Sequence, residues 1–328
     1  MLAILRRFTG KLKSIKVPKS DDWTKNLKAL LGPNLLLDAP LGSLTTYRSG
    51  GSARAFLTLN SMAEIEELAL ALTKVAIPEL LILGNGSNLL VSDNGFNGLV
   101  VKLSNSFGEF EASEGLCSIP GGMDLPVASR RLAALGLSGF EWAVGVPGTM
   151  GGAVKMNAGG HGSSVEKTIN EVSVFDLRSL ELRGLGPSEL DFSYRHSGLT
   201  RFQIVLAAKV SVFQSDPKIC KEKLSEIVAW RRANQPGGQN SGSVFKNPAS
   251  VPAAVLIESA GLKGLRVGKA EVSTRHSNFI QLEKGGLSKD VLAVMASVKT
   301  RVLETTGEVL RPEVILVGFN LEEYAVFL

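Results

Sequence analysis

Two glycine-rich segments place the strongest limit on how this chain can fold. Gly84-Asn85-Gly86-Ser87-Asn88 separates two short apolar runs, Leu80–Leu83 and Leu89–Val91, so we expect a strand, a tight loop and a second strand. The second segment runs from Gly145 to Gly160. Glycine allows positive φ angles and close approach, so successive backbone amides in such loops can converge on a phosphate. An ordinary tight turn explains each loop equally well by itself.

Neither segment matches a common nucleotide-binding pattern. Gly84 and Gly86 are followed by no third glycine and no ribose-binding acid at the spacing of the dinucleotide fingerprint, and no Gly-Lys-Ser/Thr phosphate loop occurs. The two loops therefore indicate phosphate binding without identifying the ligand.

Helices and strands are intermixed along the chain rather than alternating regularly. Ser61 and Glu64 have the spacing of a capping box, which predicts a helix through Leu72. Asp124, Asp216-Pro217 and Ser288 begin further predicted helices, which extend to Gly136, Trp230 and Gly307. Further strands are expected over Val100–Leu103 and around Val172–Phe175.

Composition excludes several classes of protein. The 328 residues exceed what one core usually fills, so we expect two or three domains. No apolar run approaches the roughly 18 residues of a membrane helix, so we expect a soluble protein without membrane insertion. The net charge of +5 resides largely in the first nineteen residues, which we interpret as a basic extension rather than a signal peptide. The remainder is nearly neutral, which argues against nucleic-acid binding.

Cysteine and histidine usage argues against disulfides and metals. Cys117 and Cys220 are far apart in the sequence and neither has a partner at metal-ligand spacing, which indicates a reducing, cytoplasmic setting. The chain has three histidines and no histidine-pair motif, so no metal site is expected. His161 is interpreted as a loop residue.

Both glycine-rich segments, in order and spacing, resemble the FAD-binding loops of the UDP-N-acetylenolpyruvoylglucosamine reductases. The resemblance implies an α+β fold: a two-part FAD-binding domain of the vanillyl-alcohol-oxidase type plus a C-terminal α+β substrate-binding domain. It implies FAD bound without a covalent link. The implied cofactor contacts are Gly84, Asn85, Gly86, Ser87, Asn88, Leu89, Pro147, Gly148, Thr149, Gly151, Gly152, Ala153, Asn157 and Gly159.

Three further segments resemble the active-site motifs of the same family. They are Phe192–Ser197, Gly242–Pro248 (preceded by Gln235-Pro236) and Leu310–Val314. By this resemblance Arg195 would hold the substrate carboxylate, Ser243 would donate a proton, and Glu313 would complete the catalytic set. Tyr194, Lys246, Asn247 and Lys263 would bind substrate, and Arg231 and Arg232 are further candidates for its phosphates. The spacing of Arg195 and Ser243 resembles the shorter form of the family.

The implied chemistry requires such a set. When a carbon–carbon double bond conjugated to a carboxylate accepts a hydride at its far carbon, negative charge develops on the near carbon and the carboxylate oxygens. A guanidinium can bind those oxygens through two donors, and a hydroxyl can deliver the proton that completes the reduction. Taken singly, Arg195 could pair with a surface acid, Ser243 could be a loop residue and Glu313 could lie on a strand edge.

The resemblance implies the following function and organisation. NADPH would reduce FAD, and UDP-N-acetylglucosamine enolpyruvate would become UDP-N-acetylmuramate for peptidoglycan synthesis, in a monomer or a weak homo-oligomer. A flavin oxidase of another small substrate and a non-catalytic flavin-binding protein are the alternatives. We expect a basic extension over 1–21, FAD-binding subdomains over 22–104 and 105–214, a substrate-binding domain over 215–318, and a tail over 319–328.

Overall fold

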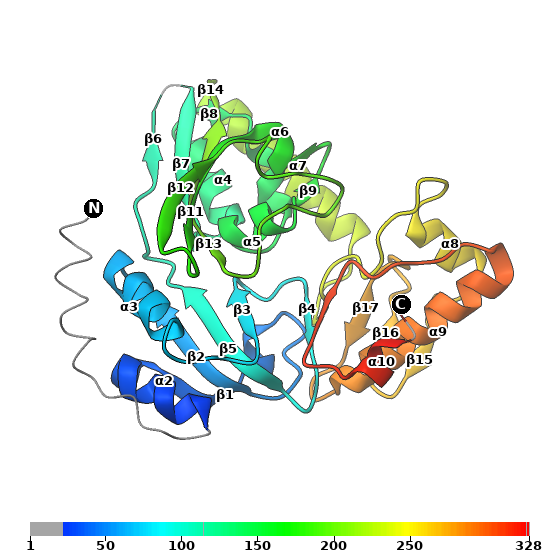
Figure 1. Cartoon of the computed structure of the whole chain (residues 1–328). Helices are drawn as coiled ribbons and strands as arrows, with labels where there is room; N and C mark the ends of the chain where they lie inside the picture. Colours follow the sequence, from blue (N-terminus) through cyan, green and yellow to red (C-terminus); the bar gives the residue numbers. More distant parts are fainter. Residues whose placement is uncertain (1–21, 114, 326, 328) are drawn as a thin grey trace. The chain divides into compact units, whose positions relative to one another are not determined.

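The computed structural model describes residues 22–113, 115–325 and 327 (Figure 1). The basic N-terminal extension expected from the sequence lies outside these residues. The chain forms two compact units. Unit 1 comprises Met1–Ala39, Ala53–Gly84 and Asn97–Lys221, and unit 2 comprises Pro40–Ser52, Asn85–Phe96 and Glu222–Leu328. The chain thus enters unit 2 twice as short insertions before its C-terminal third.

A four-stranded sheet with two helices forms the first part of unit 1. Its strand order is β1 (Leu36–Ala39), β2 (Ala53–Leu59), β5 (Phe96–Leu103) and β3 (Leu80–Leu83), and β3 runs parallel to β5. Helices α2 (Trp23–Leu31) and α3 (Met62–Leu72) pack apolar faces on this sheet (Figure 1). Ser61 caps α3 by accepting from the Glu64 amide at 3.3 Å, as its spacing predicts.

A five-stranded antiparallel sheet forms the second part of unit 1. Its order is β12 (Glu181–Leu185), β11 (Ile169–Asp176), β13 (Gln203–Ser211), β7 (Leu116–Pro120) and β6 (Glu111–Ala112). Its core includes side chains of α4 (Leu125–Ala134) and α5 (Met150–Lys155). The smaller elements are the 3-10 helices η1 (Gly32–Asn34) and η3 (Glu141–Gly145), strands β8 (Leu137–Ser138), β9 (Gly159–Gly160), β10 (Ser163–Ser164) and β14 (Phe213–Gln214), and α6 (Val165–Thr168).

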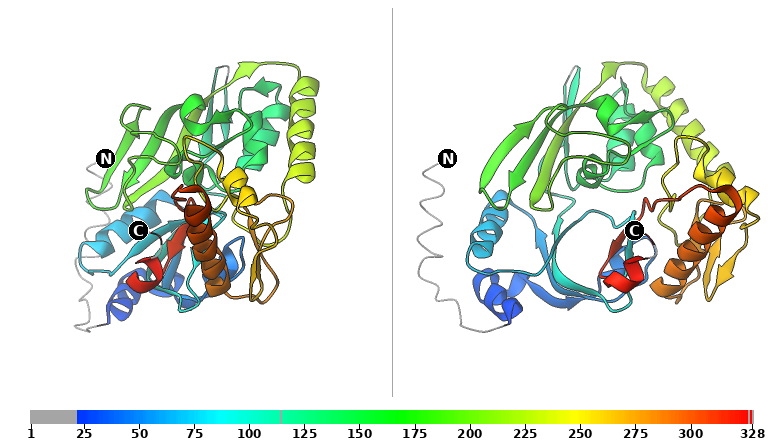
Figure 2. Two further views of the ribbon diagram at one scale, coloured as in Figure 1. Left: turned by 90° about the vertical axis from the view of Figure 1, so that its right-hand side faces the viewer. Right: turned by 45° about the vertical axis from the view of Figure 1, so that its right-hand side comes forward.

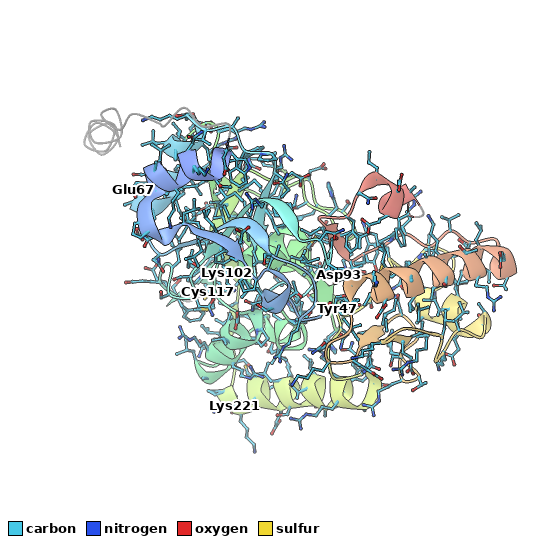
Figure 3. The ribbon with its side chains drawn as sticks, turned by 90° about the horizontal axis from the view of Figure 1, so that it is seen from below. Tyr47, Glu67, Asp93, Lys102, Cys117 and Lys221 are labelled. Carbon is cyan, nitrogen blue, oxygen red and sulfur yellow. The ribbon has the colours of Figure 1, made fainter. Side chains whose placement is uncertain are left out.

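Unit 2 is built on a three-stranded antiparallel sheet and a parallel strand pair. The sheet order is β15 (Arg266–Val267), β16 (Ala270–Val272) and β17 (Ile280–Leu282), and α9 (Ser288–Thr306) packs against it (Figure 2). Strand β4 (Leu89–Val91) pairs in parallel with β18 (Ile315–Val317). The unit also contains the 3-10 helix η2 (Gly42–Leu44), α8 (Ala253–Ser259) and α10 (Leu321–Ala325). Helix α7 (Pro217–Asn234) crosses the boundary between units at Lys221, which Figure 3 labels.

One carboxylate from the second insertion caps α9. Asp93 accepts the backbone N–H groups of Ser288 and Lys289 at 2.9 and 3.0 Å, and Figure 3 labels it at this end of the helix. Two of the amides that a helix start leaves unpaired are thereby satisfied, by a residue far away in sequence. The insertion containing β4 is therefore fixed to the C-terminal part of unit 2.

The predicted elements are confirmed, with changes at their ends. Strands β3 and β4 have the expected bounds, but β5 begins at Phe96, four residues before the predicted Val100. Helix α7 continues past the predicted Trp230 to Asn234. None of the described helices is both long and apolar enough to span a bilayer. No cluster of potential metal ligands occurs among the described residues.

Candidate active site

The two glycine-rich loops meet in unit 1 at Gly84 and Thr149. A Cβ atom on Gly84 would lie 2.6 Å from Thr149 Oγ1, closer than real side chains tolerate. Thr149 itself caps α5, because its Oγ1 accepts from the Gly152 amide at 3.3 Å. The end of β3 and the start of α5 therefore approach at a separation that only glycine allows.

Most amides of the second loop are already paired within unit 1. Met150 and Gly151 donate to the carbonyls of Met123 and Gly121 at 2.9 and 2.8 Å. The N–H groups of Gly148 and Thr149 have no partner among the described residues of unit 1, and Gly148 has a φ of 129°. These two adjacent amides are the part of the loop best suited to an anion.

A third glycine-rich segment, Gly121-Gly122, is not among the segments expected from the sequence and supports the second loop. A Cβ on Gly121 would lie 2.0 Å from the Val205 carbonyl oxygen, and one on Gly122 would lie 2.4 Å from the Ser104 carbonyl oxygen. Both glycines let this segment lie close to neighbouring backbone. The Gly121 carbonyl then accepts the hydrogen bond from Gly151 in the second loop. The adjacent glycine pair was the available signal in the sequence.

In unit 2 the first loop packs against residues Leu44 to Thr46, which were also not expected from the sequence to be part of the site. Gly86 has a φ of 61°, and a Cβ there would lie 2.7 Å from the Leu44 carbonyl oxygen. Its own carbonyl accepts from the Thr46 amide at 3.3 Å, while the buried Thr46 Oγ1 has no hydrogen-bond partner among the described residues. A buried hydroxyl without a partner beside a glycine cradle is what a phosphate or ribose ligand would satisfy.

The buried Tyr47 follows in the same segment. Its hydroxyl donates to the Ile280 carbonyl at 3.1 Å, and burial raises the pKa of this hydroxyl to about 12. Figure 3 labels Tyr47, whose ring lies in the core of unit 2. The segment beside the first loop is therefore anchored in that core.

Arg195 sits at the tip of a tight turn in unit 1. Ser193 and His196 exchange both backbone hydrogen bonds, at 3.2 and 3.0 Å, so Tyr194 and Arg195 are its two central residues. Arg195 has a φ of 57°, an unusual value for a non-glycine residue and typical of the second central position of a type II turn. Its Nη2 donates to the Gly159 carbonyl at 3.2 Å, and its guanidinium lies 5.1 Å from the Tyr194 ring centre.

Ser243 and Glu313 lie on neighbouring segments of unit 2. The Glu313 and Val244 backbones are joined by an N–H···O bond of 2.8 Å, and Val244 in turn donates to Asn278 at 2.9 Å. The buried Asn278 side chain fixes this arrangement, because it accepts from the Phe245 amide and donates to the Phe245 carbonyl, at 3.0 and 2.8 Å. Both Ser243 and Glu313 are half-buried, and the Ser243 hydroxyl has no hydrogen-bond partner among the described residues of unit 2.

Two of the predicted substrate residues have structural contacts of their own. Asn247 Oδ1 accepts from the Ala253 amide at 3.0 Å at the start of α8, and Lys263 forms a 2.6 Å ion pair with Glu258. Lys246 is half-buried and Tyr194 is exposed.

Arg231 lies near the end of α7. Its Nε donates to Gln235 Oε1 at 2.8 Å, and burial lowers the pKa of its guanidinium. Arg275 donates to the carbonyls of Arg232 and Gln235, which neutralises the end of the same helix.

His276 has a buried Nδ1 without a hydrogen-bond partner among the described residues. Burial lowers its pKa, and the nearby positive charge of Lys263 lowers it further. The imidazole is therefore held in its neutral form near pH 7. Its ring packs edge-on against Phe279, with 4.7 Å between ring centres.

The structure thus brings the predicted residues together in two groups. Unit 1 joins Gly84, the second loop and Arg195, and unit 2 joins the rest of the first loop, Ser243 and Glu313. That all of these act on one ligand stays a prediction from the sequence.

Comparison with known proteins matches two parts of the chain. Residues 53–179 match a model of FAD-binding domains, and residues 234–317 match the C-terminal domain of UDP-N-acetylenolpyruvoylglucosamine reductase. The chain is 39% identical to the UDP-N-acetylenolpyruvoylglucosamine reductase of Synechococcus sp. (strain RCC307), over 87% of this chain and 94% of that protein. It is also 39% identical to the protein of that name from Heliobacterium modesticaldum, over 85% and 89%.

One solved structure is similar over nearly its whole length. The UDP-N-acetylenolpyruvylglucosamine reductase of Thermus caldophilus superposes with a TM-score of 0.74 at 32% identity, covering 86% of this chain and 98% of that one. The two matched family models include both glycine-rich loops, within residues 53–179, and the segments that hold Ser243 and Glu313, within residues 234–317.

Proposed function

The chain belongs to the UDP-N-acetylenolpyruvoylglucosamine reductase family, and on that basis we propose that it converts UDP-N-acetylglucosamine enolpyruvate to UDP-N-acetylmuramate, with NADPH as reductant. It is an oxidoreductase with an α+β FAD-binding domain and the C-terminal domain of this family. The reaction is a step of peptidoglycan precursor synthesis. A cytoplasmic setting is supported by the two cysteines, both of which are free and buried.

The residues of both glycine-rich loops fit FAD. The amides of Gly148 and Thr149 in unit 1 and the Thr46 hydroxyl in unit 2 have no partner among the described residues of their own unit, so each suits a phosphate oxygen. The absence of a Cβ at Gly84 and Gly86 lets the first loop pack closely against Thr149 in unit 1 and against Leu44 in unit 2. When bound, FAD would supply the hydride carrier between NADPH and the substrate double bond. We propose that the predicted loop residues hold the cofactor through their backbone more than through their side chains.

Arg195 is proposed to bind the substrate carboxylate. Its guanidinium presents its N–H donors in a planar fork that matches a carboxylate, and its Nη2 is held by the Gly159 carbonyl. Its half-buried position strengthens its attraction for the negative charge that develops on the carboxylate as the double bond is reduced. Its turn and its contact with Gly159 hold that charge in place before substrate arrives, so little reorganisation is needed.

Ser243 is proposed to donate the proton that completes the reduction, and Glu313 to stabilise the enol-like form that precedes it. Ser243 suits this role because it is half-buried and its hydroxyl bonds to no described residue of unit 2. The direct backbone bond between Glu313 and Val244 keeps the carboxyl-bearing residue beside the serine segment. Because the two segments are held together, the carboxyl and the hydroxyl stay correctly oriented between stabilisation of the enol-like form and its protonation.

The nucleotide is proposed to be bound by cationic and polar residues. The candidates are Tyr194, Lys246 and Asn247, which adjoin the motif residues, and Lys263, whose charge suits a doubly anionic ligand. The half-buried Arg231 has only the neutral Gln235 as partner among the described residues, so it also suits the doubly charged diphosphate. The ion pair of Lys263 with Glu258 is partly exposed and would exchange for phosphate at small cost.

The observation that carries the proposal is the 39% identity over 87% of the chain, together with the match of residues 234–317, which hold Ser243 and Glu313, to the C-terminal domain of the family. The test is to reduce the bound flavin anaerobically with NADPH and then add the enolpyruvyl nucleotide. We expect the yellow absorbance to return and UDP-N-acetylmuramate to form. A flavin that stays reduced with the nucleotide but is rapidly oxidised by oxygen would instead indicate an oxidase, and the proposal would be rejected.

A further inference from the structure

Each glycine-rich loop contains an asparagine whose side chain reaches the backbone of a proposed catalytic segment. Asn157 Nδ2 donates at 3.0 Å to the carbonyl of Ser193, the first residue of the turn that presents Arg195. Asn88 Nδ2 donates at 3.0 Å to the carbonyl of Glu313 itself. The two contacts lie in different units, yet they follow the same plan.

The orientation of the Asn157 carboxamide is dictated by its partners. Its Oδ1 accepts from the Glu166 backbone N–H, which can only donate, at 3.1 Å. Its Nδ2 faces the Ser193 carbonyl and the Glu166 carboxylate, which accept, at 3.0 and 3.1 Å. Turning the amide over would set donor against donor and acceptor against acceptor. The side chain is only 4% exposed, so its hydrogen-bonding capacity is spent inside unit 1.

The turn of Arg195 is fastened to the second loop at three points. Asn157 holds Ser193, the Gly159 carbonyl accepts from Arg195, and the Lys155 carbonyl accepts from Ser197 Oγ at 2.8 Å. Both Asn157 and Arg195 have left-handed backbones, with φ of 41° and 57°, a conformation that persists only where surrounding contacts enforce it. The contacts named here supply that enforcement.

Asn88 does the same for Glu313 in unit 2. Besides its side-chain bond, its carbonyl accepts from the Ile315 amide at 3.0 Å, so it joins the segment on both sides of Val314. It directly precedes β4, whose parallel pairing with β18 continues the contact. The loop that carries Asn88 thereby sets the position of the Glu313 backbone.

We propose that Asn157 and Asn88 are positioning residues, which act through Arg195 and Glu313 and not as side-chain contacts of the flavin. This inference rests on the proposed function. The loops that receive the cofactor then also place the groups that handle the substrate, so that a disturbance of either asparagine slows the reduction of the substrate while leaving the flavin bound and reducible.

The test compares isosteric variants by half-reaction. Asn157→Asp and Asn88→Asp each replace a donor with an oxygen that repels a carbonyl. We expect bound FAD and the rate of flavin reduction by NADPH to stay within about twofold of wild type, and flavin reoxidation by the enolpyruvyl nucleotide to slow about 5- to 150-fold, the range for a buried carbonyl left without its donor. Asn105→Asp is the matched control, because Asn105 is exposed and its side chain bonds to no described residue.

A double variant separates positioning from folding. In Asn157→Asp with Glu166→Gln, the new amide at position 166 can donate to the carboxylate introduced at position 157, which removes the repulsion between two carboxylates, yet the Ser193 carbonyl still lacks its donor. Thermal stability should therefore recover while slow reoxidation persists. If the rate recovers together with the stability, or if FAD occupancy falls in step with the rate, the positioning role is refuted. A wild-type enzyme that the nucleotide fails to reoxidise removes the proposed function and this inference together, whereas normal rates in both single variants remove the inference alone.

Discussion

Replacing Gly84 with alanine tests whether the two glycine-rich loops must touch. The new Cβ would lie 2.6 Å from Thr149 Oγ1, whereas contacts under 3.0 Å are essentially never seen, so either one loop moves by at least 0.4 Å (3.0 − 2.6) or the Thr149 side chain rotates. Moving the backbones costs about 1–3 kcal/mol, and rotating Thr149 away instead loses its α5 cap, worth about 1 kcal/mol. Because the less costly response sets the result, we expect a total loss of about 1 kcal/mol, divided between FAD affinity and the free energy of unfolding.

The assay measures both parts of that loss. Flavin fluorescence titration gives the Kd for FAD, and denaturant unfolding of the FAD-free protein gives its stability. Gly186→Ala is the control, because a Cβ there meets nothing closer than 3.9 Å. If the clash is the cause, Gly84→Ala will cost less when Thr149→Ala is already present. An equal cost in both backgrounds, or no cost at all, would refute the contact between the loops.

Three further outcomes are expected. The pKa of Tyr47 rises from 10.0 to about 12 on burial, so the unfolded chain loses this proton first, and stability should fall by about 3 kcal/mol as pH rises from 10 to about 12. In denaturant unfolding at alkaline pH, Tyr47→Phe should reduce the fall of the unfolding free energy between pH 10 and about 12, and an unchanged slope would contradict a raised pKa of Tyr47. Asp93→Ala removes the acceptor for the Ser288 and Lys289 amides and should lower the free energy of unfolding in denaturant by about 1–2 kcal/mol. No measurable change would show that this cap does not stabilise the protein. Arg195→Lys keeps the charge but loses the planar fork, so steady-state kinetics should show a higher KM for the enolpyruvyl nucleotide and a lower kcat, with flavin reduction spared; unchanged constants would exclude a role in carboxylate binding.

The local elements could be predicted from the sequence because their signals are local. The spacing of Ser61 and Glu64 predicts the start of α3, and the apolar runs Leu80–Leu83 and Leu89–Val91 predict the strands β3 and β4. The start of β5 was placed too late, because Asn97 and Gly98 interrupt the apolar pattern although their backbone belongs to the strand. The ends of a strand are set by backbone hydrogen bonds, so the side chains at those ends need not follow the apolar pattern.

What the sequence could not reveal depends on partners distant along the chain. Leu44 and Thr46 support the first loop, and Gly121 supports the second, through close backbone approaches that no spacing rule encodes. The side-chain contacts of Asn88 and Asn157 are with residues 225 and 36 positions away. The resemblance of the two loops to FAD-binding loops implied that both asparagines contact the cofactor, and nothing near them in the sequence indicates these distant partners.

The most direct test is a single turnover of the pre-reduced Ser243→Ala variant with the enolpyruvyl nucleotide. The return of flavin absorbance measures the rate of reoxidation. We expect NADPH to reduce this variant at the wild-type rate and the nucleotide to bind, but reoxidation to slow by about 10²- to 10⁴-fold, because the proton donor is gone. Reoxidation at the wild-type rate, or an equal loss in both half-reactions, would show that Ser243 is not the group that completes the reduction.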